Sequence, residues 1–296
     1  MQHLPTWPLP ISAHRDESVC GKTEVANRYT CRMYLEVNHA RTYAYTGGKR
    51  FDPALPVVAF VHGAQHDLSV WILQSRYLAH HGYAVLAVDL PGHGRSEGDP
   101  LRSIESMADW LLAFLDVAGV ATASVAGHSG GSLIALEAAA RQPSRVAALA
   151  LVGTAFPMRV ADDLLSATRD DEAAAIDMIN IWSHSGYAQK PSSPGPGFWV
   201  MGQNKRLMER MRPGVLHADF AACNAYGNGL VAAAAIKCPT LFILGRRDMM
   251  APVRAAAGLR KAIPGAQTVE IPGSGHALLA EAPDAVLDAL RGFLAR

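Results

Sequence analysis

The sequence predicts an α/β fold, in which a mostly parallel β-sheet is flanked by helices and interrupted once by a helical insertion. Short apolar runs alternate with helical patterns along most of the 296 residues. Half of the residues are hydrophobic and 18% are charged, which is enough for a large buried core. One long interval without a strand pattern breaks the alternation, and it is the signal for the insertion.

Six apolar runs are the expected strands of the parallel part of the sheet. They are short and apolar on both faces, as in strands that helices cover on both sides. They span residues 57–61, 83–89, 122–127, 146–153, 240–245 and 268–271. Helical patterns at 103–118, 130–141, 253–262 and 283–294 alternate with them, which favours parallel strands. Ahead of these runs, the alternating segment Met33–Gly47 predicts a hairpin that turns at Asn38–His39.

The interval from Pro157 to Ile236 contains helical patches at 161–181 and 203–211 and a Pro/Gly/Ser-rich stretch at 190–197. Such an interval is too long for a structureless loop in a compact domain. We therefore expect residues 157–236 to form a helical cap, inserted between residues 31–156 and 237–296 of one core. Residues 1–30 have an irregular pattern and are expected to be an N-terminal extension.

Charge and composition argue against several kinds of partner. A net charge of +1 gives no reason to expect nucleic acid, and no apolar run reaches the roughly eighteen residues that span a bilayer. The first residues lack the basic start and apolar core of a signal peptide. The four scattered cysteines form no CxxC pair, which is typical of reduced thiols. We expect a cytoplasmic protein that acts on a small molecule.

Ser129 is the candidate nucleophile. It lies in a G-x-S-x-G pattern, Gly127 to Gly131, between a predicted strand and a predicted helix. A serine on so sharp a turn takes strained backbone angles, and the flanking glycines avoid clashes. The following helix also directs its N-terminal amides toward the site, which favours an oxyanion. An ordinary glycine-rich turn is the alternative, but the strand before it and the helix after it favour the nucleophile.

A serine needs a base, and a base of this kind needs an acid that orients it. His276 follows the last strand and precedes the final helix, so it is expected at the carboxyl edge of the sheet, beside Ser129. Asp248 follows the preceding strand at the same edge. The chain order Ser129, Asp248, His276 is the one that this architecture requires. Glu270 and Asp284 are alternative acids, and a helix cap is the alternative role for Asp248.

A tetrahedral intermediate also needs two hydrogen-bond donors for its oxyanion. The segment His62-Gly63 directly follows a strand, and the backbone amide of Ala64 together with that of Gly130 would supply the pair. The side chain of Gln65 is a less favoured donor.

The same loop also allows a metal site, formed by His62, His66 and Asp67. The absence of a third, distant cluster of ligands disfavours it. His62 is expected to hold the loop in place. We expect no metal and no other cofactor, because side chains and water suffice for the chemistry.

With these pieces, the chain resembles the α/β-hydrolase superfamily, in its cap-bearing, esterase-like branch. The resemblance covers roughly residues 33–296 and is carried by "GHSGG" (127–131), "HGA" (62–64), "GRRD" (245–248), "GSGH" (273–276) and "VDLPGHGRSEG" (88–98). The last segment is no dinucleotide fingerprint, because Glu97 stands where a third glycine is required. Ser129 replaces the aspartate of relatives that act on epoxides or halides. Ala277 replaces the tryptophan that usually follows the histidine in carbon–carbon hydrolases.

Unlike in prolyl aminopeptidases, no tryptophan follows Ser129. The resemblance therefore implies a serine hydrolase that cleaves carboxylic esters through an acyl-enzyme. In this fold the cap would cover the serine, with Trp182, Phe198, Trp199 and Tyr226 as candidate substrate-binding residues, although packing within the cap explains each of them equally well. The alternatives are the same triad acting on a thioester, amide, lactone or carbon–carbon bond, and a ligand receptor that does not turn over.

Overall fold

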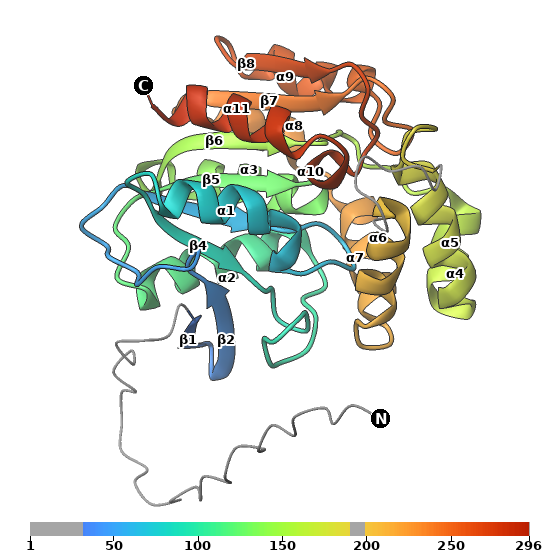
Figure 1. The fold of residues 1–296 in the computed structure, drawn as a ribbon, viewed down its shortest axis with the longest axis horizontal. Helices are drawn as coiled ribbons and strands as arrows, with labels where there is room; N and C mark the ends of the chain where they lie inside the picture. Colours follow the sequence, from blue (N-terminus) through green and yellow to red (C-terminus); the bar gives the residue numbers. More distant parts are fainter. Residues whose placement is uncertain (1–31, 190–198, 296) are drawn as a thin grey trace, which may run out of the picture.

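The structure, a computed structural model, describes residues 32–189 and 199–295, which form one sheet between two layers of helices (Figure 1). The sheet has eight strands in the order β1-β2-β4-β3-β5-β6-β7-β8. β1 and β2 form an antiparallel hairpin, β2 pairs antiparallel with β4, and all other pairs are parallel. The strands are β1 (Arg32–Val37), β2 (Ala40–Tyr45), β3 (Val57–Val61), β4 (Ala84–Val88), β5 (Ala123–His128), β6 (Val146–Val152), β7 (Thr240–Gly245) and β8 (Gln267–Ile271). The predicted fold class is confirmed.

The apolar strands divide their side chains between two cores. In β3 every residue is buried, with Val58 and Phe60 in the core under α1 (Ile72–Ala79) and α11 (Pro283–Leu294). Ala59 and Val61 point to the opposite core, under α2 (Ile104–Val117) and α3 (Gly130–Arg141). Because successive strand residues face opposite ways, a strand covered on both sides must be apolar throughout.

The remaining helices lie between β6 and β7 or follow β7. They are α4 (Asp162–Asp170), α5 (Glu172–Ser183), α6 (Val200–Glu209), α7 (Val215–Ala225), α8 (Gly229–Ala234), α9 (Ala257–Ala262) and α10 (Leu278–Glu281). Short 3-10 turns span Leu68–Trp71, Pro143–Arg145 and Val253–Ala256. The helices α1, α7, α8 and α10 were not predicted from the sequence.

Three expectations need correction. β8 is not buried on both faces: it is an edge strand, and Val269 is 37% exposed. The patch at 161–181 is two helices, because the side chain of Asp171 caps a new helix by accepting from the Ala174 amide. The segment 253–262 starts as a 3-10 turn before it becomes α9.

The helices α4 to α7 form a core of their own beside the carboxyl edge of the sheet (Figure 1). That core includes Leu164, Ile176, Ile179, Met208 and Phe220. α8, at the end of the same interval, packs against α3 and α9. The helices α4 to α7 therefore lie over the loops that follow the parallel strands.

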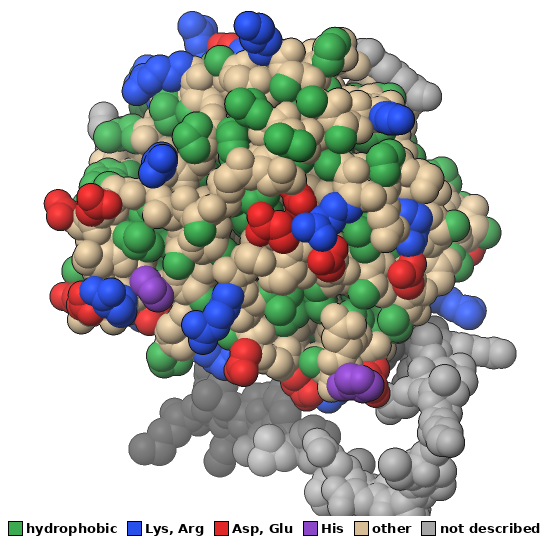
Figure 2. Space-filling model, turned by 180° about the vertical axis from the view of Figure 1, so that it is seen from behind, with side chains coloured by type: hydrophobic (Ala, Val, Ile, Leu, Met, Phe, Trp, Pro, Cys, Tyr) green, Lys and Arg blue, Asp and Glu red, His purple; other side chains and the backbone are tan. Residues whose placement is uncertain are grey.

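Seen from behind, the molecule carries hydrophobic side chains scattered among charges of both signs (Figure 2). Of the helices in the described part of the chain, none has the length and apolar character that crossing a membrane requires. The predicted extension at residues 1–30 and the stretch at 190–197 lie outside the described residues.

Candidate active site

Ser129 stands on the turn between β5 and α3, with φ +53° and ψ −123°. A positive φ is uncommon for a residue other than glycine and is kept only where the surroundings enforce it. Here the Ser129 amide donates to the carbonyl of Val152 in β6 at 2.9 Å, and the Ser129 carbonyl accepts from the amide of Ser132 at 2.8 Å. The turn holds the hydroxyl out at the carboxyl edge of the sheet.

The glycines of this turn are required by close packing. A Cβ on Gly127 would lie 2.1 Å from the carbonyl oxygen of Gly131, and a Cβ on Gly131 would lie 2.3 Å from that of His62. Both neighbours are backbone atoms, so neither can move aside cheaply. The sharp bend and the adjacent loop after β3 are thus packed against each other without room for side chains.

We expect Gly131→Ala to destabilise the fold by about 2–4 kcal/mol, because the added methyl group must displace backbone. Urea unfolding would measure the change. Gly292→Ala in α11 is the matched control, since a Cβ there meets no neighbouring atom within 4 Å. Equal stability of the two variants would contradict the packing argument.

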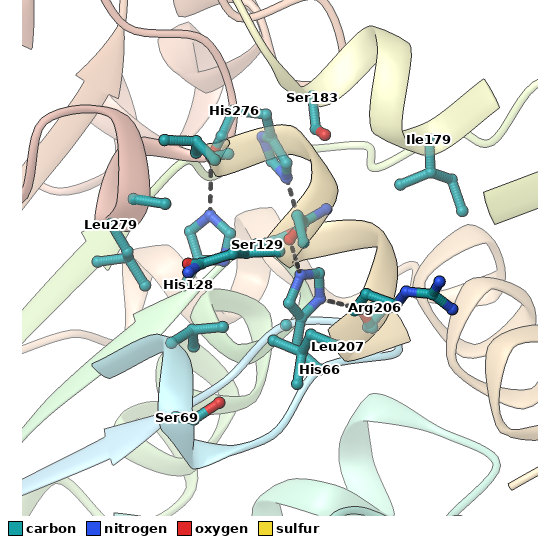
Figure 3. A pocket seen from close by; sticks show the side chains of 18 of the residues that line it. His66, Ser69, His128, Ser129, Ile179, Ser183, Arg206, Leu207, His276 and Leu279 are labelled. Carbon is teal, nitrogen blue, oxygen red and sulfur yellow. Dashed lines mark hydrogen bonds between the residues drawn. The ribbon is translucent and has the colours of Figure 1, made fainter. Parts of the chain in front are cut away.

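Ser129, His276 and Asp248 meet at this edge, although they are far apart in the chain. The Nε2 atom of His276 lies 2.9 Å from the Ser129 Oγ, and its Nδ1 atom lies 2.7 Å from Oδ2 of Asp248. Figure 3 shows the imidazole of His276 pointing at the Ser129 hydroxyl. Asp248 follows β7 and His276 follows β8, so parallel strands deliver all three side chains to one edge.

Asp248 is buried and held by its own loop. Its Oδ1 accepts from the amides of Met250 and Ala251 at 2.9 and 2.7 Å. Burial alone raises the pKa of Asp248, but His276 and these amides outweigh burial and leave the pKa below its usual value. The carboxylate therefore accepts the proton of Nδ1, which leaves Nε2 of His276 free to accept from the Ser129 hydroxyl.

Sequence reasoning missed His128, which directly precedes the serine. Its Nε2 donates to the carbonyl of His276 at 2.9 Å and so fixes the backbone of that residue. Burial lowers the pKa of His128 to about 3, so the ring is neutral. Only the contact between β5 and the loop after β8 reveals this role, because nothing in the local sequence marks it.

The backbone amides of Ala64 and Gly130 are close to each other beside Ser129. A Cβ built on Gly130 would lie 3.9 Å from the Ala64 nitrogen, and one on Gly63 would lie 3.1 Å from the Ser129 Cβ. Gly130 is the first residue of α3, so its amide has no acceptor within the helix. Within the described chain, the Ala64 amide donates to no hydrogen bond either. Two amides without an acceptor thus lie close to the nucleophile turn.

Both ring nitrogens of His62 and of His66 form hydrogen bonds with groups of the protein. The Nδ1 of His62 donates to the Gly63 carbonyl at 2.8 Å, and its Nε2 accepts from the Leu90 amide at 3.1 Å. Burial, and next His93, lower the pKa of His62 to about 3, so it is neutral and links two loops. Among residues 32–189 and 199–295, no group of three or more potential ligands could hold a metal ion.

Two chambers adjoin Ser129, and both also touch Ala64, Phe220, Met250 and His276. The larger, about 610 Å³, is lined by side chains of α5 and α6 and by the loop after β3. The smaller, about 190 Å³, is lined mainly by apolar side chains, among them Met158, Leu164, Trp182 and Met249. Figure 3 shows His66, Ile179 and Leu207 around the larger chamber.

The four expected substrate-binding residues have different positions. Trp182 lines the smaller chamber, and Trp199 lines the larger one at its exposed rim. Phe198 lies outside the described residues. Tyr226 lines neither chamber: its hydroxyl donates to Oε2 of Glu137 at 2.6 Å and its ring packs in the main core. That buried hydrogen bond explains why the prediction for Tyr226 is wrong.

Neither alternative acid pairs with His276 in the described part of the chain. Glu270 is exposed on β8 and pairs with Arg246 at 3.6 Å. Asp284 is exposed in the first turn of α11. Oδ1 of Asp248 binds amides of the loop before the 3-10 turn Val253–Ala256, and that turn begins after Pro252 without a side-chain cap. The alternative role of Asp248 as a helix cap is therefore wrong.

Residues 56–283 match a family model described as the alpha/beta hydrolase fold. The chain is 30% identical over 249 residues to a protein of Klebsiella pneumoniae that carries the provisional name carbamate hydrolase RutD, which covers 76% of this chain and 86% of that relative. It is 31% identical over 230 residues to the pimeloyl-[acyl-carrier protein] methyl ester esterase of Chromobacterium violaceum, covering 75% and 87%. The solved structure of a thermophilic esterase superposes with a TM-score of 0.73 at 26% identity, covering 89% of this chain and 97% of the other.

Proposed function

The chain belongs to the α/β-hydrolase family, and on that premise we propose that it is a serine hydrolase that cleaves carboxylic esters of small to medium, largely apolar substrates. The observation that carries the proposal is the continuous hydrogen-bond relay from Asp248 through His276 to the hydroxyl of Ser129. The esterases among the relatives support the same bond class.

The mechanism follows from the direction of these hydrogen bonds. His276 Nε2 takes the proton of Ser129 as the oxygen attacks the acyl carbon, and Asp248 stabilises the imidazolium that forms. The amides of Ala64 and Gly130 bind the oxyanion of the tetrahedral intermediate. The imidazolium then gives its proton to the leaving alcohol, and water releases the acyl group by the same steps in reverse.

The two chambers that adjoin Ser129 provide space for two parts of a substrate. The smaller suits a short apolar group, because Met158, Leu164 and Trp182 line it. The larger accepts the rest of the substrate between the loop after β3 and α6. We propose that α4 to α7 act as the cap over these chambers and that the protein works in the cytoplasm without a cofactor.

A fluorophosphonate probe tests the activated serine without knowledge of the substrate. We expect the wild type to be labelled within minutes, and Ser129→Ala and His276→Ala to remain unlabelled at the same probe concentration. Ser144→Ala is the control, because Ser144 is exposed in the 3-10 turn Pro143–Arg145, which precedes β6 at the opposite edge of the sheet from Ser129. Labelling of Ser129→Ala would refute the assigned nucleophile.

A panel of substrates tests the bond class. A relative with a carbamate hydrolase name favours one specific alternative, so p-nitrophenyl esters should be compared with carbamates, thioesters, amides and lactones of matched size. We expect esters with short apolar acyl groups to give the largest kcat/KM. Far faster turnover of another bond class would replace the ester assignment, and tight binding without multiple turnover would favour a receptor.

A further inference from the structure

The loop Gly63–Gln65 carries the Ala64 amide, and the two peptide planes on either side of Ala64 are both held by side chains. In the first plane the Gly63 carbonyl accepts from His62 Nδ1 at 2.8 Å and from the His66 amide at 3.3 Å. The C=O and N–H of one trans peptide point in opposite directions. Holding the Gly63 carbonyl therefore aims the Ala64 N–H.

The second plane is held at both ends. The Ala64 carbonyl accepts from His66 Nδ1 at 2.6 Å, and the Gln65 amide donates to Oδ2 of Asp219 at 2.8 Å. Gln65 itself has φ +55°, a conformation that costs free energy in a residue other than glycine. The loop is thus strained, and contacts from outside the loop must keep it in this shape.

Asp219 supplies such a contact from α7, in the inserted helices. It is 4% exposed, and its Oδ2 also accepts from Nε2 of His93 at 2.8 Å, while Nδ1 of His93 donates to the Pro91 carbonyl at 3.0 Å. Burial alone lowers the pKa of His93, but the carboxylate and these hydrogen bonds raise it above its usual value. Both ring nitrogens of His93 lie against acceptor oxygens, an arrangement that requires a proton on each nitrogen. The resulting imidazolium balances the carboxylate, whose charge would otherwise oppose an oxyanion near it.

The second oxygen of Asp219 shows what this placement costs. Oδ1 is buried and has no hydrogen-bond partner among the residues that the structure describes. A buried carboxylate with one unsatisfied oxygen is a poor way to stabilise a fold. Asp219 also lines a small cavity together with Ala64, Gly130 and Cys223. Its position is explained by what Oδ2 does for the loop.

We propose that Asp219 is a positioning residue for the oxyanion hole, acting through the Gln65 amide to aim the N–H of Ala64. The proposal rests on the proposed serine hydrolase function. It makes the inserted helices part of the machinery that stabilises the transition state, in addition to covering the chambers. Misaiming one donor weakens the transition-state complex and leaves ground-state binding unchanged, so it lowers kcat and not KM.

Three variants test this role. Asp219→Leu removes the acceptor at similar volume, and Asp219→Ser, whose side chain is too short to reach the Gln65 amide, serves if the leucine variant does not fold. Asp219→Asn keeps an oxygen for that amide. Glu137→Gln is the matched control, because Glu137 is another buried carboxylate that binds residues after α7 but does not touch the loop.

The readouts are kcat and KM for a p-nitrophenyl ester and inhibition by a trifluoromethyl ketone and its methyl ketone analogue. The fluorinated ketone forms a tetrahedral adduct on Ser129 whose oxyanion needs the Ala64 amide, whereas the methyl ketone binds without an adduct. We expect Asp219→Leu and Asp219→Ser to lower kcat about 10- to 100-fold with KM within about twofold. The preference for the fluorinated ketone should fall by the same factor. Asp219→Asn should keep most of the wild-type kcat and most of the preference for the fluorinated ketone.

Wild-type preference for the fluorinated ketone establishes the serine hydrolase before any variant is compared. Without that preference the proposed function fails, whatever Asp219 does. With it, an unchanged preference in Asp219→Leu or Asp219→Ser would overturn the positioning role. An equal loss of preference for the fluorinated ketone in Glu137→Gln would also overturn the positioning role, because the effect would then follow from loss of stability alone.

Discussion

Replacing Ser129 or His276 with alanine is expected to lower kcat about 10⁴-fold or more, the largest effect of any change considered. Without the Oγ there is no nucleophile, and without Nε2 nothing accepts its proton. Asp248→Asn is expected to lower kcat about 10⁴-fold, because the amide no longer holds the imidazole in the Nδ1–H form. Steady-state kinetics with a p-nitrophenyl ester would measure all three.

Glu270→Gln and Asp284→Asn are the controls for the acid. Both lie on exposed surface away from the imidazole, so turnover within twofold of the wild type is expected for each. A large loss in either variant, together with an active Asp248→Asn, would show that the hydrogen bond between Asp248 and His276 is not the one that matters.

Three buried histidines are expected to make the fold sensitive to mild acid. Burial lowers the pKa of His62 and His128 to about 3 and that of His184 to about 4. Below pH 6.5 these rings gain protons only in the unfolded chain, so the free energy of unfolding falls as the pH falls. Each group contributes about 1.4 kcal/mol per pH unit, or on the order of 5 kcal/mol for all three between pH 6.5 and 5.

Urea unfolding at a series of pH values would measure this loss. His184→Gln should reduce the slope between pH 6.5 and 5 by about one proton, whereas His39→Gln should leave it unchanged because the His39 side chain is 99% exposed. His93 has a raised pKa and therefore acts in the opposite range, where stability is lost as the pH rises above 6.5. A free energy of unfolding that is constant from pH 6.5 to 5 would contradict the prediction.

Much of the architecture could be predicted because buried parallel strands leave a strong local signature. β3 and β4 are apolar at every position, so periodicity and length identify them without knowledge of their neighbours. The expectation that β8 is buried on both faces was wrong, because its sequence QTVEI includes Glu270 and only two apolar residues, as suits a partly exposed edge strand. The helices α1, α8 and α10 were not predicted, because each is too short to show a helical period in the sequence.

The residues of the candidate site also fall into those that the sequence could predict and those that it could not. Ser129, Asp248 and His276 follow strands at one edge, and the order of strands and loops indicates where they meet. His128 and Asp219 could not be found like this, because each acts across a contact between distant elements. The prediction for Tyr226 was wrong for a related reason. Its hydroxyl pairs with Glu137 on α3, and no local sequence pattern indicates that pair.

The hydrogen bond between Gln65 and Asp219 joins residues 154 positions apart, one in the sheet domain's own loop and one in the inserted helices. A chimera that exchanges the segment between β6 and β7 for that of another relative would break this bond unless the donor segment carries a carboxylate at the same place. His93 must be kept with Asp219, because its imidazole binds the same carboxylate oxygen as the Gln65 amide. Libraries that shuffle the insertion to alter substrate range should hold both residues constant.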